Sequence, residues 1–213
     1  MLYKVLDKDG ESCNGGDAQW SLPTKNEDGT WTAGEWMPTI KGKLIPCKNG
    51  YHLTRDERVI QWLNETIWEA EYSGEVDEKA DKLVCRKSRL LRKFEGWNDK
   101  TARLFAADCA EHVLHLFEKK CPDDKRPRQA IEDARKFANG EITSEELATA
   151  WAAAGDAAWD AAGDAAWAAW AAARDAARAA AWDAAWAAAG DAAWAAAGDA
   201  ERKWQYQKLV EYL

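Results

Sequence analysis

Apolar residues in the first hundred positions occur in short groups separated by turn residues, which is typical of strands joined by loops. Residues 2–6 and 51–53 have the composition of buried strands. Over residues 67–72, apolar and acidic side chains alternate with the period of a half-buried strand, and residues 82–85 are its predicted neighbour. The pattern predicts a small mixed β-sheet in this part of the chain.

Helical signals replace this pattern further along. Residues 54–57, Thr-Arg-Asp-Glu, have the form of a capping box and predict a helix that ends near Leu63. Residues 101–120 carry an apolar stripe at helical spacing, formed by Leu104, Phe105, Cys109, Val113, Leu116 and Phe117. Pro127 and Gly140 suit the first turn and the left-handed stop of the next helix. A second capping box, at residues 143–146, opens the last part of the chain.

The segment 151–200 is a low-complexity repeat with only five residue types: 30 Ala, 7 Trp, 7 Asp, 4 Gly and 2 Arg. An octad is visible, in which Trp is followed by Ala and a Gly-Asp pair. Alanine has the highest helix propensity and tryptophan contributes a large buried area, so this composition favours packed helix over disorder.

A single helix over residues 144–213 would be about 105 Å long, at about 1.5 Å per residue, so the segment is expected to fold back. A break near Arg174 gives each of two helices one tryptophan-bearing face. In the alternative, the four Gly-Asp pairs end and begin several short helices.

These patterns predict an α+β protein of two domains. Residues 1–98 form a small mixed-sheet domain, and residues 99–213 form an all-α helical hairpin or bundle that contains the Ala/Trp octads, about 147–200. A tryptophan, alanine and glycine face could also be covered by a second copy of the chain, so a homo-oligomer stays open.

Charge narrows the classes of partner. The net charge is −8, and neither half of the chain is a polycation, which argues against duplex nucleic acid and anionic membranes. One local basic run, Arg86, Lys87, Arg89, Arg92 and Lys93, is best explained as a solvated strand or helix edge. No stretch of 18 apolar residues and no secretory signal is present, so we expect a cytoplasmic protein whose five widely spaced cysteines are reduced.

Two groups of residues have the elements of a reactive site. Cys109, His112, His115 and Cys121 contain metal-binding types, but their spacing on one helix prevents convergence, and we interpret them as structural. His52 precedes a strand that carries Glu69 and Glu71, a combination suited to general acid/base work, although a structural role is favoured. No phosphate-binding glycine loop or nucleophile elbow occurs, so we predict no catalytic residue, no metal site and no cofactor.

The octad tryptophans offer flat surfaces for stacking. Arg174, Arg178 and Arg202 could neutralise a phosphate beside them, which makes a nucleotide a reasonable ligand. The favoured alternative is a dry core of tryptophan rings packed against alanine and glycine. The candidate ligand-binding residues are Trp159, Trp167, Trp186, Trp194, Arg174, Arg178 and His52.

Residues 111–118, Glu-His-Val-Leu-His-Leu-Phe-Glu, and 122–132, from Pro-Asp-Asp-Lys to Ala-Ile-Glu, resemble the immunity-protein-5-like family of bacterial polymorphic-toxin systems over roughly residues 100–200. The resemblance implies an all-helical protein that binds a toxin, with no catalytic residues to carry over. The N-terminal half resembles a domain of unknown function found in phage and bacterial proteins. Residues 50–52, Gly-Tyr-His, are also weakly similar to the ADP-ribosyltransferase fold, in which only His52 finds a counterpart.

Three hypotheses follow. The first is a non-enzymatic binding protein of bacterial or phage conflict systems, which neutralises a protein partner as a toxin-immunity protein or as an inhibitor of host defence. The second is a protein that sequesters a nucleotide signal between its tryptophan-bearing helices. The third is a degenerate ADP-ribosyltransferase-like protein that binds NAD.

Overall fold

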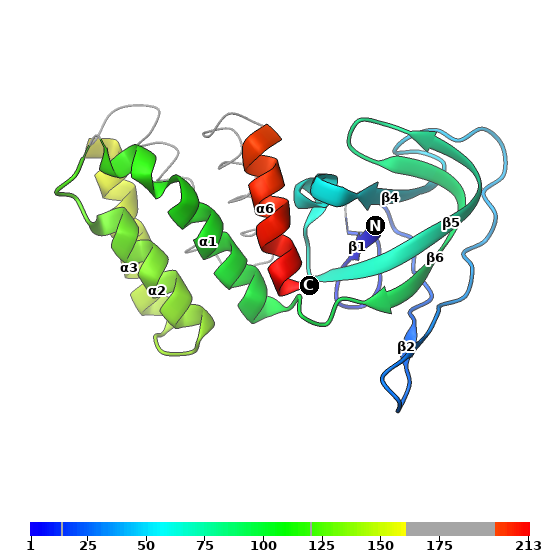
Figure 1. Ribbon diagram of the computed structural model, residues 1–213, viewed down its shortest axis with the longest axis horizontal. Coiled ribbons are helices and arrows are strands. Elements are labelled where there is room, and N and C mark those ends of the chain that lie inside the picture. Colours follow the sequence, from blue (N-terminus) through cyan, green and yellow to red (C-terminus); the bar gives the residue numbers. More distant parts are fainter. Residues whose placement is uncertain (14, 120, 161–198) are drawn as a thin grey trace. The chain divides into compact units, whose positions relative to one another are not determined.

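The computed structural model describes residues 1–13, 15–119, 121–160 and 199–213. The chain divides into two compact units, Met1–Trp97 and Asn98–Leu213, and each is considered by itself. The first unit contains the strands and the second contains the helices α1, α2, α3 and α6 of Figure 1, which confirms the α+β class.

An antiparallel sheet that closes on itself forms the first unit. Strands β1 (Leu2–Leu6), β4 (Tyr51–Arg55), β6 (Leu83–Lys93) and β5 (Thr66–Glu78) are neighbours in that order, and β5 pairs with β1 to complete the closure. Short strands β2 (Thr24–Lys25) and β3 (Trp31–Thr32) form a separate hairpin. All described strand pairs are antiparallel, so the prediction of a mixed sheet is wrong.

The predicted strands are present, and the two long ones extend well beyond their sequence signals. Strands β5 and β6 pair from Trp68 opposite Lys93 to Glu78 opposite Leu83, with register shifts after Glu69 and after Ser73. Such irregularities bend a strand and increase its twist, which helps a sheet of few strands to close. Figure 1 shows both strands strongly curved.

The helix predicted from the first capping box is wrong in type and in its cap. Residues Asp56–Trp62 form a 3-10 helix, η1, and Arg55 precedes it without a side-chain cap. Thr54, the expected cap, is the partner of Tyr3 in the β1–β4 pair, and its hydroxyl donates to the Asp81 carbonyl at 3.4 Å. Strand pairing with a distant segment therefore outweighs the local capping signal.

A buried cluster fills the inner side of this sheet. It comprises Leu6, Trp20, Met37, Tyr51, Leu53, Trp68, Ala70, Cys85 and Leu90. The approach of the chain to β4 depends on Gly50, whose φ of +145° is outside the range that other residues favour. A Cβ atom there would lie 2.3 Å from Val84 Cγ1, so β4 approaches β6 closely only because this position is glycine.

The helices of the second unit are α1 (Asp99–Glu118), α2 (Arg126–Ala138), α3 (Ser144–Asp160) and α6 (Asp199–Tyr212). Asn98 caps α1 by accepting from the backbone N–H groups of Lys100 and Thr101. The capping box predicted for α3 is confirmed: the Glu146 carboxylate accepts from the Thr143 N–H at 2.8 Å, and Thr143 Oγ1 accepts from the Glu146 N–H at 3.3 Å.

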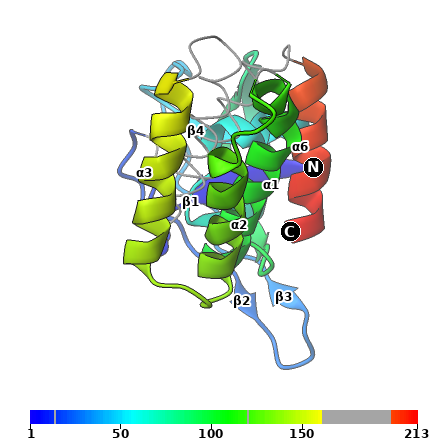
Figure 2. The same cartoon turned by 90° about the vertical axis from the view of Figure 1, so that its left-hand side faces the viewer.

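Helix α2 packs between α1 and α3, and α6 packs on α1 (Figure 2). Three alanines, Ala107, Ala110 and Ala134, permit the close approach of α1 and α2. They share a core with Val113, Leu114, Ile131 and, from α3, Leu147. Phe105 and Cys109 of the predicted stripe are fully buried, whereas Leu104 and Leu116 are only partly covered. None of the described helices has the length and apolar content needed to cross a membrane.

The octad segment lies mostly outside the described residues. Trp167, Trp186, Trp194, Arg174 and Arg178, together with the expected break near Arg174, fall within 161–198. Trp159 is in the described backbone of α3, but its side chain is outside the description. The predicted tryptophan faces therefore remain predictions.

Candidate functional site

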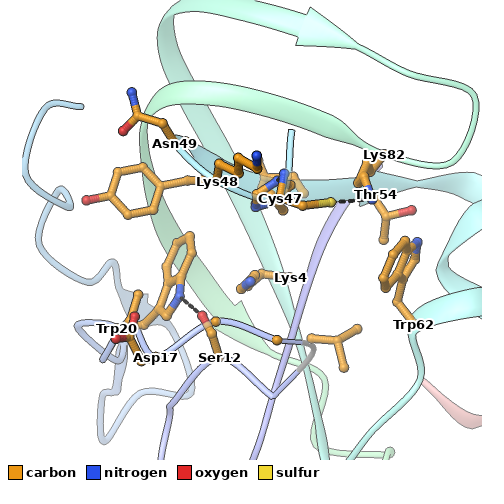
Figure 3. Close-up of a pocket in the computed structure, with 18 of the residues that line it drawn as sticks. Lys4, Ser12, Asp17, Trp20, Cys47, Lys48, Asn49, Thr54, Trp62 and Lys82 are labelled. Carbon is orange, nitrogen blue, oxygen red and sulfur yellow. Dashed lines mark hydrogen bonds between the residues drawn. The ribbon is translucent and has the colours of Figure 1, made fainter. Parts of the chain in front are cut away.

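A cavity of about 520 Å³ opens in the first unit, and Figure 3 shows the side chains around it. Strands β1 and β4 supply one wall, residues 12 and 15–20 a second, and the segment 47–50 that leads into β4 a third. Trp62 of η1 and Lys82, just before β6, complete it. The cavity is thus assembled from residues that span positions 3 to 82 of the sequence.

Lys4 is the central side chain of the cavity. It lies on β1 between Leu2 and Leu6, which pack against the inner cluster of the sheet. Its ammonium is 4.9 Å from the centre of the Trp20 ring, a cation–π distance. Burial lowers the pKa of Lys4 to about 8, against a weaker opposing effect of the Cys13 and Cys85 thiols. No carboxylate pairs with this ammonium in the part of the chain that the structure describes.

Lys82 is a second cation at the rim. Its Nζ lies 4.8 Å from the centre of the Trp62 ring, donates to Cys47 Sγ at 3.3 Å and is 3.3 Å from the Asp81 carboxylate. Burial disfavours its charge, but the contacts with Cys47 and Asp81 outweigh burial and raise the pKa of Lys82. Lys82 is therefore a firmly charged ammonium.

His52 lines the same cavity, from β4. Its Nε2 accepts a hydrogen bond from the Cys47 backbone N–H at 2.9 Å. Burial, and then the charges of Lys4 and Lys82, lower the pKa of His52, so the ring is neutral at pH 7 and its proton is on Nδ1. The ring therefore has a hydrogen-bond donor at Nδ1 and no free base at Nε2.

The carboxylates expected beside His52 are engaged elsewhere. Glu69 accepts from Arg92 at 2.6 Å, and Glu71 accepts from Arg89 at 2.6 Å, both across the β5–β6 pair. Arg86 and Glu75 form a third such bridge. Three of the five basic side chains on β6 are thus paired with carboxylates of β5. The predicted strand edge is wrong, because β6 lies between β4 and β5 in the closed sheet. The arrangement of His52 with Glu69 and Glu71 as an acid/base group is not formed.

The histidine and cysteine group of the helical unit is also structural. Cys109 is fully buried, and the His112 ring stacks on Trp204 of α6 at 3.7 Å, with its Nε2 3.0 Å from Glu201. Within the described residues no cluster of three or more metal-ligating side chains occurs. All five cysteines are free thiols.

Asp108 of α1 is the centre of a polar network in this unit. Its carboxylate accepts from Arg135 of α2 at 2.8 Å and from the Tyr212 hydroxyl of α6 at 2.8 Å. Arg135 also donates to Glu111 at 2.6 Å. Three helices are therefore joined by charge-assisted hydrogen bonds on one side of α1.

Of the site residues predicted from sequence, the structure places only the side chain of His52. Lys4, Trp20, Trp62 and Lys82 were not predicted, because they become neighbours only in the folded sheet. The one available signal was a lysine in the otherwise apolar strand 2–6.

The model of the family described as "Imm-5 like putative immunity protein" matches residues 92–212, more than half of the chain. No curated protein and no solved structure matches. The match covers the helical unit with its Asp108 network and confirms the resemblance seen in residues 111–132. This chain belongs to the Imm-5 like family of immunity proteins.

Proposed function

We propose that this chain is a non-enzymatic binding protein of bacterial or phage conflict systems, which neutralises a toxin or defence protein through its helical unit. The observation that carries this proposal is the family match over residues 92–212. The family description names immunity proteins, whose task is to bind a partner rather than to transform a substrate.

The charge of the helical unit favours a partner with a basic surface. Residues 98–213 carry 20 acidic and 14 basic side chains, a net charge of −6 out of −8 for the whole chain. Glu132, Glu141 and Glu145 on and after α2 are exposed, and none has an ion pair within the described residues. Free carboxylates of this kind speed the encounter with a cationic partner and make it sensitive to salt.

Rigidity of the scaffold also supports binding without a large rearrangement. The Asp108 network and the alanine-rich contact of α1 with α2 fix three helices relative to one another. A surface that is already formed in the free protein loses little conformational entropy on association.

Co-expression tests this proposal. Each gene beside the one that encodes this chain is induced alone, and those whose products stop bacterial growth are induced again together with the full-length chain. We expect growth to recover with at least one such product and not with a chain in which Glu132, Glu141 and Glu145 are all replaced by lysine. Unrelieved toxicity in every pairing, or the absence of any toxic neighbour, would contradict the proposal.

A further inference from the structure

The cavity of the first unit is a concentration of positive charge in an acidic chain. Three lysines line it, Lys4, Lys48 and Lys82, against one lining carboxylate, Asp17, and the Asp81 carboxylate that pairs with Lys82 at 3.3 Å. The unit as a whole carries 15 basic and 17 acidic side chains over residues 1–97. The local excess of cations therefore arises from the placement of these residues and not from the composition of the unit.

Lys4 is the strongest indication that an anion belongs there. A buried ammonium is normally paired with a carboxylate, because its desolvation is costly. The described residues provide Lys4 with the face of Trp20 alone, and a ring face compensates an ammonium only partly. A bound anion would supply the missing countercharge.

Three hydrogen-bond donors belong to residues that line this space. They are the Lys4 ammonium, the Lys82 ammonium and the Nδ1–H of His52, whose orientation is fixed by the Cys47 N–H at its other nitrogen. In Figure 3, Trp20 and Trp62 lie on opposite sides of Lys4, and Lys82 lies beside Trp62. A tetrahedral oxyanion accepts from several such donors at once, whereas a cation would meet repulsion from both lysines.

Size and wall chemistry indicate that the anion is attached to a larger group. Cavities that hold small organic ligands measure roughly 300–1,000 Å³, and this one is about 520 Å³, more than an inorganic phosphate needs. Trp20, Tyr51 and Trp62 provide aromatic wall. The polar atoms of Trp20 and Tyr51 are already bonded, to Ser12 and to the Pro38 carbonyl, so these residues offer the cavity apolar surface.

We propose that this cavity binds a small phosphate ester carrying a flat ring, of the size of a nucleoside monophosphate. Lys4, Lys82 and His52 hold the phosphate, and the aromatic wall covers the ring. All residues that line this cavity belong to the first unit, so the site would provide the chain with a small-molecule ligand in addition to its protein partner.

Isothermal titration of the full-length chain tests this proposal. The probes are the four common ribonucleoside 5′-monophosphates, their nucleosides, and inorganic phosphate. We expect at least one monophosphate to bind, and its nucleoside and inorganic phosphate to bind at least ten-fold more weakly. No binding of any monophosphate at millimolar concentration would overturn the proposal, as would equal affinity for the monophosphate and for either of its parts.

Variants locate the site. Lys4→Met and Lys82→Met are each expected to weaken the monophosphate at least ten-fold, while Lys43→Met, at an exposed lysine outside the cavity, leaves the affinity unchanged. Since Lys4 lies on β1 and Lys82 lies just before β6, misfolding of one variant does not remove the test. Wild-type affinity in a folded Lys4→Met or Lys82→Met chain would overturn the assignment.

Discussion

Replacement of Lys4 by methionine should stabilise the first unit, because it removes a half-buried charge for which the described residues provide no carboxylate partner. Methionine has nearly the same length and no charge, so it can follow the path of the lysine stem along β1 without a cavity. The expectation is opposite to that for an ordinary substitution in a core, which lowers stability.

The magnitude follows from the pKa of Lys4. A decrease from 10.5 in the unfolded chain to about 8 in the folded protein corresponds to a penalty of about 3 kcal/mol for the charged form at pH 7. The lost contact with Trp20 offsets about 0.5–2 kcal/mol of this gain. Lys4→Met should therefore raise the free energy of unfolding by about 1–3 kcal/mol at pH 7.

The advantage of the variant depends on pH in a defined direction. Below pH 8, Lys4 is charged in both the folded and the unfolded states, and the full penalty is present. Between pH 8 and 10.5 the folded state is neutral while the unfolded state still binds the proton, so wild-type stability rises with pH relative to the variant. The contribution of the Lys4 charge to the stability difference between variant and wild type, without the Trp20 contact, should decrease from about 3 kcal/mol at pH 7 to about 1 kcal/mol at pH 10.

The assay is equilibrium unfolding in urea at pH 7 and pH 10, read by a short hydrogen-exchange pulse in peptides from residues 1–97. This readout isolates the first unit from the second. A Lys4→Met chain that is less stable than wild type at pH 7, or a difference between the two that does not change with pH, would refute the reasoning that the Lys4 charge is buried without compensation.

Three other predictions concern packing. Gly50→Ala should lower the free energy of unfolding by at least about 2 kcal/mol, because the added Cβ would lie 2.3 Å from Val84. Gly29→Ala, at a positive φ but with open space around it, should lower it by less. Urea unfolding of both variants tests this, and equal losses of stability would contradict it. Tyr212→Phe should cost about 1 kcal/mol through its lost bond to Asp108, measured as faster exchange in α6, and unchanged exchange would contradict it. If the octads form a core, replacement of any one of Trp159, Trp167, Trp186 and Trp194 by alanine should lower the free energy of unfolding by about 3–5 kcal/mol. Melting curves of the four variants that all stay near wild type would instead indicate a binding surface.

Local patterns predicted the elements where local and distant interactions agree. Residues 2–6 are mostly apolar and are followed by turn residues, and β1 has those bounds. The capping box at Thr143 works because nothing else competes for its hydroxyl. The similar signal at Thr54 fails because Thr54 pairs with Tyr3 of β1 as part of a strand, and the sequence around Thr54 contains no trace of that partner.

The cavity could not be predicted for the same physical reason. Lys4, His52 and Lys82 are separated by 30 residues or more, and they meet only because β1 and β6 both pair with β4. The sequence identifies His52 as a possible acid or base. Its hydrogen bond with the Cys47 backbone N–H, however, depends on a turn in which Cys47 has a positive φ. The structure therefore changes His52 from a candidate base into a candidate donor.

The family assignment, by contrast, came from a contiguous stretch. Residues 111–132 lie on α1, α2 and the turn between them, where the sequence itself keeps neighbours together. The contacts between helices that follow one another in the chain are local, so a short stretch of sequence contains both of the elements that pack together.

The central claim, that the helical unit neutralises a protein partner, is tested most directly by hydrogen exchange on the complex of the full-length chain with a toxic protein encoded beside its gene. We expect a stoichiometric complex in which amide protection increases within residues 98–213, with the strongest effect around the exposed glutamates of α2 and the turn that follows. Protection confined to residues 1–97, or unchanged exchange throughout the chain at saturating partner, would contradict the account.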